Sequence, residues 1–583
     1  MRRILVILLL AMFPILIRAE ETPKEENPLK GLEEYIEKTR VDWQVPGVGV
    51  AIVKDDKVIF AKGFGTANIE KNQLVTPKTL FAIASITKSF TTYIMGKLVE
   101  EHKLDWNAPV TQYIPIFRMY DKMITDHVMV RDIVCHRTGL PGHDLVWCIQ
   151  NNFTLEDFVK RLPYLENNKE LRSTWQYNNL MYCAAGYLIE QITKKSWQEN
   201  INDYIFQPLS MNRSNCSVII SQKDLDYATP YKNINDKITA IAFHNISNIG
   251  PAGAINSCVE EMANWMILHL NMGLWQNKQL MNALTMQELH SPQIFIPYHD
   301  DTSYALGWFI ENYHEHEFIS HGGNIDGFTS ELTLCPKEKI GVIILTNLDQ
   351  TLLPTILAHH VMDVMLKLEP QDMNAQYLKD KQQKEKNIKQ AKNNRELTRY
   401  KNTSFSHNLE YYVGEYENSG YGIIRISIQD KQLMLHYNNE KTTLTHWHYD
   451  TFVFNLDEHQ IPIIFQTNYF GEIDAISTPL EPLVQNILFS RQPDMKLLDP
   501  DYLTQFVGKY DFNGTILDIV LEGTQLKIAH NNNEEFLVAT NNNIFNCEDT
   551  PLERIHFIFD TTGKVKELWV ENEIGVLIAP RKP

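Results

Sequence analysis

The tetrapeptide Ser85-Ile-Thr-Lys88 stands where a strand-like segment ends and a long helical pattern begins. The helical pattern carries an apolar face made of Ile86, Phe90, Tyr93, Ile94 and Leu98. Residues three positions apart lie on the same side of a helix, so the Lys88 amine can lie over the Ser85 hydroxyl. The partial positive charge at a helix start favours an alkoxide and lowers the pKa of a nearby lysine. The spacing therefore predicts an activated serine, which is what a hydroxyl needs to attack a carbonyl carbon.

A Ser-x-x-Lys pair is weak evidence by itself, because an ordinary helix cap can have the same residues. It occurs once in this chain, however, and two further motifs support it. Tyr-x-Asn occurs five times, and we favour Tyr177-Asn-Asn179 because a polar loop precedes it and an amphipathic helix follows it. His-x-Gly occurs once, at His321-Gly-Gly323 on a predicted strand, where glycine lets a substrate backbone approach the strand edge.

In this order, the three motifs resemble those of the serine β-lactamase-like superfamily. They are most similar to its class C branch, which groups class C β-lactamases, low-molecular-mass penicillin-binding peptidases and related esterases. Further stretches that carry the resemblance are Pro46-Gly-Val-Gly-Val50, Leu104-Asp105, His136-Arg-Thr-Gly-Leu-Pro141, Pro251-Ala-Gly-Ala-Ile-Asn256 and Gly322-Gly-Asn-Ile-Asp-Gly327. The resemblance covers about residues 28–366 and implies one catalytic domain.

The resemblance implies a serine hydrolase that forms an acyl-enzyme on Ser85. Lys88, alone or with Tyr177, would remove the serine proton, and the coupled titration of the two groups leaves the identity of the base open. Tyr177 would then protonate the leaving group, and Asn179 would orient Lys88 and the substrate amide. The backbone N–H groups of Ser85 and Asn324 would form the oxyanion hole. The substrate-binding residues implied in this way are His321, Gly322, Gly323 and Asn324.

One position departs from many lactamases and transpeptidases, which have lysine where this chain has His321. The lysine ammonium helps to hold the substrate carboxylate, whereas a histidine near neutral pH is often uncharged. The sequence therefore favours hydrolysis of a peptide, amide or ester, including D-amino-acid peptides, over efficient breakdown of β-lactams. The acyl substrate stays open, because the expected pocket loops, about residues 140–170 and 213–250, contain no recognisable specificity pattern.

The order of the predicted elements indicates an α+β fold. A helix at 27–42 and a hairpin over 47–61 precede a mostly helical stretch over about 85–290, and strands return between 305 and 345. Strands at both ends with helices between them predict one antiparallel sheet with flanking helices and a helical subdomain, as in β-lactamases and transpeptidases. We place the hydrolase domain at residues 20–370.

The carboxy-terminal part is predicted to be β-rich and repeated. Residues 371–403 are rich in Lys, Gln and Asn, and form either a solvated helix or a flexible tether, a charged linker in both cases. Beyond it, Tyr412-Val-Gly-Glu-Tyr416 matches Phe506-Val-Gly-Lys-Tyr510 at an offset of 94 residues. Such self-similarity indicates two tandem units, at 404–495 and 496–583, which resemble the lipocalin-like β domains often appended to this family.

The amino terminus is typical of a secretory signal. Arg2 and Arg3 precede a 14-residue apolar run, Ile4–Ile17, and the small residue Ala19 follows it closely. The run is shorter than the roughly 20 residues that cross a bilayer, so we expect residues 1–19 to be cleaved and not retained as an anchor. The protein would then be exported, periplasmic or secreted, without an integral membrane span.

Composition narrows the possible partners. The chain has 583 residues, of which 44% are hydrophobic and 22% charged, ordinary values for a globular protein. Its net charge of −18, without a visible basic patch, disfavours nucleic acid. Seven cysteines without a Cys-x-x-Cys pair argue against a zinc ribbon and favour small buried thiols. We expect a small-molecule or peptide substrate, no metal and no cofactor, and the oligomeric state stays open.

Three other interpretations are weaker. Metal-dependent hydrolysis could use the pairs His314-x-His316, His359-His360 or His446-x-His448, but no His-Glu-x-x-His motif accompanies them. An α/β-hydrolase would need a Gly-x-Ser-x-Gly elbow, which is absent. An exported binding protein could recognise a wall polymer or lipid through the β-rich units without turnover. The three intact motifs favour the enzyme.

Overall fold

The computed structural model describes residues 28–148, 153–299, 301–456, 459–530, 533–541, 543–550 and 552–583. The predicted signal at 1–19 lies outside these residues, as does Asn27, the predicted cap of the first helix. That helix, α1 (Leu32–Asp42), begins after a turn that ends in a left-handed Gly31, and so starts later than predicted. Among the described residues, no helix is both long enough and apolar enough to cross a bilayer.

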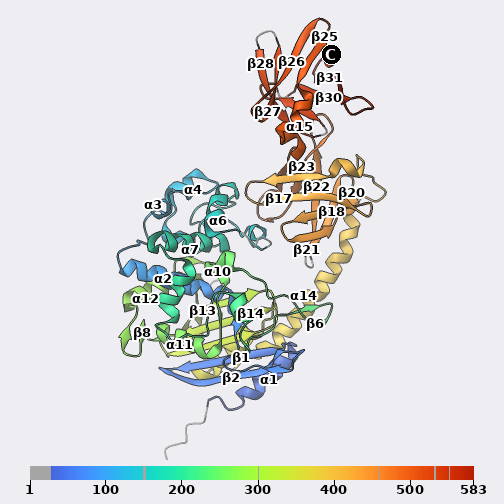
Figure 1. The fold of residues 1–583 in the computed structure, drawn as a ribbon. Coiled ribbons are helices and arrows are strands. Elements are labelled where there is room, and N and C mark those ends of the chain that lie inside the picture. The colour runs from blue at the N-terminus through green and yellow to red at the C-terminus, as the bar shows by residue number, and fades with distance from the viewer. Residues whose placement is uncertain are drawn as a thin grey trace, which may run out of the picture.

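Strands from both ends of the first part of the chain form one antiparallel sheet of nine strands (Figure 1). From edge to edge, the strands are β10 (Ile294–Phe295), β11 (Thr302–Tyr304), β12 (Phe309–Tyr313), β13 (His316–Ile325), β14 (Phe328–Cys335), β15 (Ile340–Thr346), β1 (Gly47–Lys54), β2 (Lys57–Asn68) and β3 (Gln73–Leu74). β1 pairs with β15, so that Ala51 lies opposite Ile343. The predicted α+β fold, with a sheet built from both ends, is therefore confirmed.

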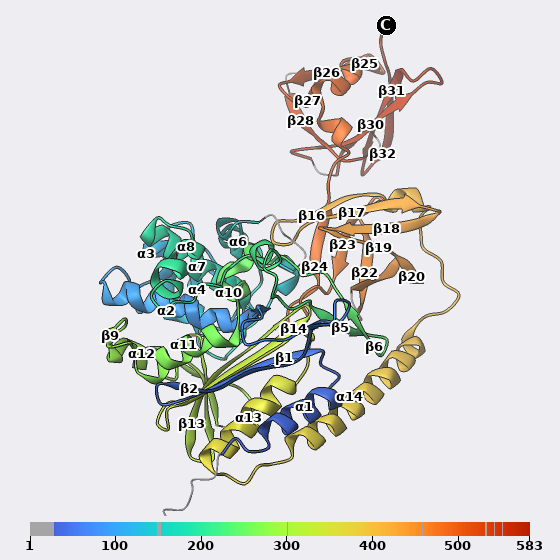
Figure 2. The same cartoon turned by 60° about the horizontal axis from the view of Figure 1, so that its bottom comes forward.

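Helices cover both faces of this sheet (Figure 2). The covering helices are α1 and α13 (Leu353–Leu366) on one face, and α2 (Thr87–Glu100) and α11 (Val259–Leu270) on the other. Side chains alternate between the faces of a strand, so Val50 and Ile344 pack under α1 and α13, and Ala51 and Ile343 under α2 and α11. A strand covered on both sides must be apolar throughout, and all of β15 is buried. Each aliphatic side chain buried in this way contributes about 2 kcal/mol.

The segment between β3 and β10 is mostly helical and forms the predicted helical subdomain. Besides α2 and α11, its helices are α3 (Val110–Tyr113), α4 (Lys122–His127), α5 (Val130–Val134), α6 (Leu155–Arg161), α7 (Asn179–Thr193), α8 (Trp197–Ile201), α9 (Val218–Ser221), α10 (Gly250–Gly253) and α12 (Ala283–Leu289). Three two-stranded ribbons complete it: β4 (Phe81–Ala82) with β7 (Asn256–Ser257), β5 (Tyr231–Ile234) with β6 (Lys237–Ala240), and β8 (Leu274–Trp275) with β9 (Lys278–Gln279).

A long helix, α14 (Met373–Arg395), connects the sheet to the carboxy-terminal part (Figure 2). Nearly all of its residues are exposed or half-exposed, so the solvated helix is observed and not the flexible tether. Its first turn is attached to α1. The Trp43 indole N–H donates to Asn374 Oδ1 at 2.8 Å, and the Asn374 amide donates to Asp42 at 2.8 Å.

Two curved antiparallel sheets follow α14. The first β unit consists of β16 (Gly414–Asn418), β17 (Gly422–Gln429), β18 (Gln432–Tyr437), β19 (Glu440–Thr443), β20 (Thr445–His448), β21 (Thr451–Leu456), β22 (His459–Thr467), β23 (Ile473–Thr478) and β24 (Ile487–Arg491). The second β unit consists of β25 (Gly508–Phe512), β26 (Thr515–Glu522), β27 (Gln525–His530), β28 (Asn533–Ala539), β29 (Ile544–Cys547), β30 (Arg554–Phe559), β31 (Val565–Asn572) and β32 (Gly575–Pro580). In the first β unit, β16 pairs with both β17 and β24, which curves the sheet into a nearly closed barrel.

The repeated sequence motif has the same structural role in both β units. In each unit a tyrosine hydroxyl donates to the carbonyl four residues earlier, and an arginine from the last part of the unit donates to the carbonyl that follows. The pairs are Tyr416–Tyr412 and Arg491–Val413 in the first β unit, and Tyr510–Phe506 and Arg581–Val507 in the second. The internal repeat is therefore a repeat of structure as well as of sequence.

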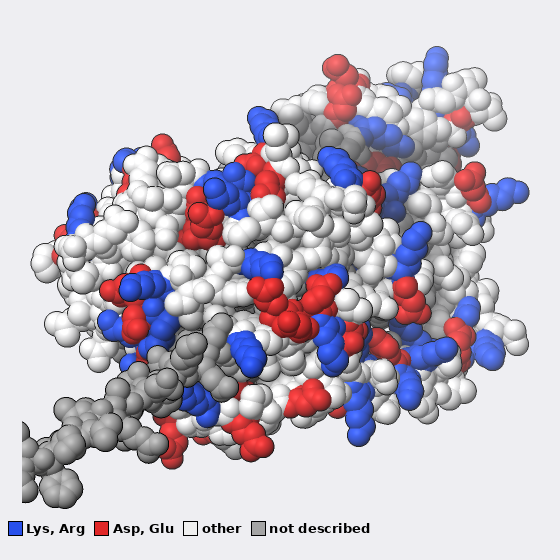
Figure 3. Space-filling model, turned by 90° about the horizontal axis from the view of Figure 1, so that it is seen from below, with Lys and Arg blue, Asp and Glu red and all other residues white. Residues whose placement is uncertain are grey.

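One face of the molecule carries charges of both signs. On the face shown in Figure 3, Lys and Arg are interspersed with Asp and Glu, without an extended area of one sign. All seven cysteines lie in the described part of the chain, and five of them are buried. Burial agrees with the interpretation of these residues as small apolar side chains.

Candidate active site

Ser85 lies in a short 3₁₀ turn, η1 (Ala84–Ile86), that leads directly into α2. The turn follows β4, which pairs with β7. Ala84 has a left-handed φ of 46°, a conformation that costs free energy for a residue with a Cβ atom. Backbone strain of this kind concentrates at functional turns. Here it sets a partly exposed Ser85 at the start of a helix.

A glycine on β13 makes room for this turn. A Cβ atom on Gly323 would lie 2.3 Å from the Ile83 carbonyl oxygen and 3.1 Å from the Ala84 Cβ. The Ser330 hydroxyl on β14 donates to the same Ile83 carbonyl at 3.0 Å. The His-x-Gly motif predicts a substrate backbone at this glycine, whereas the group that comes closest is the chain's own turn before Ser85.

Lys88 forms hydrogen bonds with three other groups of the site. Its buried Nζ donates to Ser85 Oγ at 3.1 Å, to Asn179 Oδ1 at 2.8 Å and to the Ala252 carbonyl at 2.8 Å. Burial lowers the pKa of Lys88 to about 7. When the ammonium loses one proton, the Asn179 and Ala252 oxygens match the two N–H bonds that remain. The free electron pair of the amine is then directed at Ser85.

Tyr177 lies against the same pair of residues. Its ring is 4.7 Å from Lys88 Nζ, and its hydroxyl forms a hydrogen bond with Ser85. Burial raises the pKa of Tyr177, and the hydrogen bond from Ser85 offsets only part of this effect. The ring packs 4.4 Å from that of His136, a buried imidazole whose Nδ1 accepts the backbone N–H of Asn178 at 3.1 Å. The phenol therefore stays protonated at neutral pH.

Two groups of the site have no motif that reveals them. Asp144 is one: its Oδ1 accepts a hydrogen bond from the Asn179 amide at 3.2 Å, so Asn179 bridges Asp144 and Lys88. Burial is the largest influence on the pKa of Lys88, and the negative charge of Asp144 opposes it by raising that pKa. The Ala252 carbonyl is the other. The stretch Pro251–Asn256 is part of the family resemblance, but its pattern does not say that a carbonyl there holds a lysine.

His321 is beside the site, with its ring centroid 6.5 Å from that of Tyr177, but its side chain is buried. Its Nδ1 donates to the Gly322 carbonyl at 2.6 Å, and its Nε2 accepts the Tyr304 hydroxyl at 3.0 Å. Burial and the nearby charge of Lys88 lower the pKa of His321 to about 3. The imidazole is therefore neutral and both of its nitrogens are occupied, so it does not supply the cation that lysine supplies in many lactamases.

Asn324 lies on β13 next to Gly323. Its side chain oxygen accepts hydrogen bonds from the Thr329 hydroxyl and the Gln350 N–H, both at 3.0 Å. Ile325 and Phe328 flank the two-residue turn between β13 and β14 and are partners in the ladder. Residues that flank such a turn form a hydrogen-bonded pair, and hydrogen-bonded pairs alternate with non-hydrogen-bonded pairs along the two strands. The backbone groups of Asn324 and Thr329, the next pair, therefore do not bond to each other. The backbone N–H of Asn324 is therefore directed away from β14, as an oxyanion donor would require.

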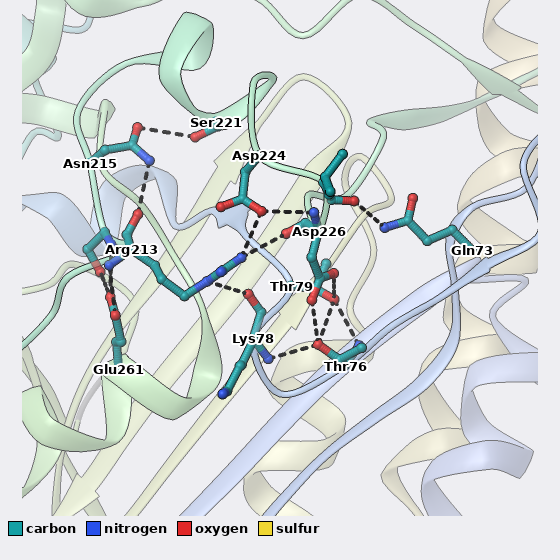
Figure 4. A network of polar contacts seen from close by, with 12 residues as sticks. Gln73, Thr76, Lys78, Thr79, Arg213, Asn215, Ser221, Asp224, Asp226 and Glu261 are labelled. Carbon is teal, nitrogen blue, oxygen red and sulfur yellow. Dashed lines mark hydrogen bonds and ion pairs between the residues drawn. The ribbon is translucent and has the colours of Figure 1, made fainter.

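A polar network holds the chain just before the Ser85 turn (Figure 4). The Asp226 carboxylate accepts hydrogen bonds from the hydroxyls of Thr76 and Thr79 at 2.6 and 2.5 Å. The Arg213 side chain donates to the carbonyl of Lys78, between these two threonines, at 3.1 Å, and the Arg213 backbone N–H donates to Glu261 on α11 at 2.8 Å. This network fixes the start of β4, and through it the position of η1.

A small, mostly apolar pocket adjoins the nucleophile turn. Its walls include Val218, Phe243, Ile246 and Ile325, and several of these residues come from the loop expected to line the pocket. Gly253 also lines it, and a Cβ atom there would lie 3.4 Å from Ile246 Cδ1 and 3.8 Å from the Ala84 backbone. The pocket therefore lies next to the turn that carries Ser85.

A group of possible metal ligands lies elsewhere. In the described part of the chain, donor atoms of His316, Cys335 and Glu338 lie within 4.8 Å of one another. These side chains already bond to each other, with His316 at 2.7 Å and Cys335 at 2.8 Å from the Glu338 carboxylate. His316 is five residues from His321 along β13, or about 17 Å at 3.4 Å per residue. The group is not part of the Ser85 site.

Two family models match the chain. The first, described as Beta-lactamase, matches residues 32–364, more than half of the sequence. The second, described as a domain of unknown function (DUF3471), matches residues 398–491, which contain the first β unit.

Three individual proteins resemble this chain at 20–28% sequence identity. The unguisins hydrolase ungD' of Aspergillus campestris is 28% identical over 446 residues, which cover 73% of this chain and 82% of that protein. The protein flp of Staphylococcus aureus is 25% identical over 337 residues, 56% of this chain and 65% of flp, slightly under two thirds of its length. Among solved structures, the octameric penicillin-binding protein homologue from Pyrococcus abyssi aligns with a TM-score of 0.55 at 20% identity, over 87% of this chain and 99% of that one. This structural likeness concerns the fold.

Proposed function

Because the chain belongs to the beta-lactamase family and is a serine hydrolase of that type, we propose that Ser85 is acylated by a peptide, amide or ester substrate, with Lys88 as the general base. The observation that carries this proposal is the hydrogen-bonding of Lys88 Nζ. Its contacts with Asn179 and Ala252 leave the electron pair of the neutral amine directed at Ser85 Oγ.

The two candidate bases differ in protonation. Lys88 has a pKa of about 7, so a large fraction of the amine is neutral at neutral pH. Tyr177 has a raised pKa and keeps its proton. In the acylation step, Lys88 takes the Ser85 proton as Oγ bonds to the substrate carbonyl carbon. Tyr177, in contact with Ser85, donates a proton to the leaving group as the carbonyl–leaving-group bond breaks, and Lys88 restores the phenol proton.

Two backbone N–H groups are proposed to hold the oxyanion. The Ser85 N–H lies at the start of α2, and the Asn324 N–H is directed away from β14 on the strand that packs against η1. Loss of one such donor costs about 2.7–4 kcal/mol in well-studied hydrolases. Water would release the acyl group by the same route in reverse, with Lys88 and Tyr177 exchanging their roles.

The substrate is proposed to carry an apolar group next to the scissile bond. Phe243, Ile246 and Val218 surround the pocket beside η1, and apolar walls favour an apolar side chain or acyl chain. The neutral, occupied imidazole of His321 does not favour a carboxylate, which argues against efficient β-lactam hydrolysis. The name of the unguisins hydrolase supports hydrolysis in general and does not identify the substrate of this chain.

We also propose that the protein is exported. The support is the sequence pattern of residues 1–19, in which two arginines precede a 14-residue apolar run. Expression of the full chain with a carboxy-terminal tag should give a mature protein whose amino-terminal sequence begins near Glu20. Recovery of an intact amino terminus in the cytosolic fraction would contradict export.

Active-site labelling tests the hydrolase proposal. A fluorophosphonate probe should label the wild-type chain covalently, and the Ser85→Ala variant should lose labelling together with turnover of p-nitrophenyl esters and D-amino-acid amides. Ser291→Ala is the matched control, because Ser291 is half-exposed and its hydroxyl only donates to the Gln287 carbonyl. Turnover retained by the Ser85→Ala variant would refute the proposal.

The same assay separates the enzyme from a binding protein. If a wall polymer or lipid binds to the wild-type chain while neither the probe nor any ester reacts with Ser85, the binding alternative is correct. Within the substrate panel, we expect long or aromatic acyl groups to react faster than charged ones. The Phe243→Ala variant should reduce this preference, because it removes one wall of the pocket.

A further inference from the structure

We propose that the first β unit is a working part of the active site, in which Glu481 acts as a positioning residue for the Asp144–Asn179–Lys88 hydrogen bonds. This inference rests on the proposed function and gives the first β unit a role in it. One chain of contacts leads from the loop after β23 to the Lys88 amine beside Ser85.

The chain of contacts starts at a buried carboxylate. Glu481 lies between β23 and β24 and is only 6% exposed. Its Oε2 accepts the backbone N–H of His143 at 2.8 Å. A buried carboxylate that accepts a backbone N–H from another domain is a strong, charge-assisted contact. His143 needs such support, because its φ of 46° is left-handed and therefore strained.

The side chain of His143 is held from both sides. Its Nε2 donates to the Glu166 carbonyl at 3.0 Å, so Nδ1 is the nitrogen that accepts, and it accepts the Tyr421 hydroxyl at 2.7 Å. Burial lowers the pKa of His143, which agrees with a neutral ring. Tyr421 also belongs to the first β unit, in which it precedes β17. Two residues of the first β unit thus fix one residue of the hydrolase domain.

Asp144, the next residue, connects His143 to the groups around Ser85. Asp144 follows His143 directly, and its Oδ1 accepts the Trp147 indole N–H at 2.7 Å and the Asn179 amide at 3.2 Å. Asn179 Oδ1 in turn accepts from Lys88 at 2.8 Å. Three hydrogen bonds therefore connect Glu481 to the proposed general base, together with the covalent link between His143 and Asp144.

Further contacts hold the first β unit against the hydrolase domain. Arg161, at the end of α6, donates to the carbonyls of Ser419 and Gly420 at 3.1 and 3.0 Å. A Cβ atom on Gly420 would lie 2.8 Å from Leu165 Cδ2, so the two domains touch closely there. One continuous cluster of buried apolar residues extends from the helical subdomain into the first β unit. The first β unit is therefore packed on the hydrolase domain and not merely attached by α14.

Movement of Asp144 would change the pKa of Lys88 in a defined direction. The groups that face its amine are Tyr177, Tyr182, Cys183, Asp144, His136 and His321. Asp144 is the carboxylate among them, and its charge raises the pKa of Lys88 against the larger, opposite effect of burial. If the turn around His143 relaxes and Asp144 moves away, the pKa of Lys88 falls. The change is small, because Asp144 is exposed and its charge is screened.

Kinetics of full-length variants test the proposal. Glu481→Ala and Tyr421→Phe should each lower kcat/KM about three- to tenfold, the size expected for one lost hydrogen bond. Both should shift the acid limb of the pH profile to lower pH, in the same direction as Asp144→Asn. Glu481→Gln keeps an acceptor oxygen for the His143 N–H and should restore most of the rate. Glu415→Ala, on β16 of the same unit and paired with Arg425, should leave rate and profile unchanged.

The outcomes separate this inference from the hydrolase proposal. Active sites are counted with the fluorophosphonate probe, so that a misfolded fraction does not count as slow enzyme. If Ser85→Ala is inactive but Glu481→Ala and Tyr421→Phe match the wild type in rate and pH profile, the positioning role is wrong and the hydrolase stands. A lower rate with an unshifted profile and no rescue by Glu481→Gln would also overturn the positioning role. If the Ser85→Ala variant retains turnover, both the hydrolase proposal and the positioning role are wrong.

Discussion

Burial acts in opposite directions on the two groups that touch Ser85. It lowers the pKa of Lys88 to about 7 and raises that of Tyr177, because burial penalises the charged form of each group. Near neutral pH, the amine can therefore accept a proton while the phenol can donate one. In the proposed reaction, a buried lysine supplies the base and a buried tyrosine the acid, without any histidine. The neutral ring of His321 fits this arrangement, because a second cation would lower the pKa of Lys88 further.

This protonation pattern predicts the pH dependence. Lys88 must be neutral to accept the Ser85 proton, and below pH 7 it becomes increasingly protonated. We expect kcat/KM for an uncharged ester to fall tenfold per pH unit well below pH 7, and to level off above it. The measurement is a pH–rate profile between pH 5 and 9 with the wild type. A rate that stays constant down to pH 5 would exclude Lys88 as the base.

At the scale of elements, the site depends on how closely β13 approaches the η1 turn. Strand β13 and helix α2 come from distant parts of the chain, and the strained Ala84 turn lies between them. Gly323 permits the contact, and the hydroxyl of Ser330 on the neighbouring strand holds the Ile83 carbonyl in place. The network around Asp226 fixes the other end of β4. Ser85 is therefore positioned by a sheet edge as well as by its own helix.

Adding one methyl group tests this contact. In Gly323→Ala, the new Cβ atom would lie 2.3 Å from the Ile83 carbonyl, and overpacking of this kind costs about 1–3 kcal/mol. We expect the acylation rate to fall at least tenfold, measured with the fluorophosphonate probe. Gly322→Ala is the control: its Cβ atom would meet the end of the Glu331 side chain at 3.0 Å, which can move aside. Equal rates in the two variants would contradict the steric argument.

The two β units have the same design but different positions in the whole molecule. The first β unit packs against the helical subdomain through the contacts of Glu481, Tyr421 and Gly420. The second β unit contacts the first, for example through Arg554, whose guanidinium donates to Glu472 at 2.6 Å and lies over the ring of Phe470. Figure 1 shows the second β unit at the far end of the molecule from the nine-stranded sheet. The same fold is thus used once beside the site and once away from it.

This asymmetry predicts different effects of equivalent substitutions. Arg491→Ala and Arg581→Ala each remove an arginine that donates to a backbone carbonyl inside one β unit, at a cost of about 1–3 kcal/mol. Both variants should unfold at lower temperature in calorimetry. Only Arg491→Ala should reduce hydrolysis, by several-fold, because it weakens the unit that supports Asp144. A several-fold loss of hydrolysis in Arg581→Ala would show that the second β unit also matters.

The sequence by itself determined the parts that depend on local spacing. Ser85 and Lys88 could be paired from the sequence because residues three apart on a helix share a side. The hairpin after residue 47, the strands before and after residue 340 and the repeat at Tyr412 and Phe506 could be found because alternation and self-similarity are local patterns. The first helix begins later than the cap residue predicts, since a cap residue by itself does not fix a helix boundary.

Only the tertiary structure decided the environment of these residues. The Ala252 carbonyl lies 164 positions from Lys88, and Glu481 lies 338 positions from His143. The neutral tautomer of His321 and the need for glycine at residue 323 depend on the groups that surround them in space. Burial and long-range hydrogen bonds are not properties of a short stretch of sequence. They set the pKa of Lys88 and the geometry around Ser85 because the folded chain excludes water from that point and fixes which oxygen atoms replace it.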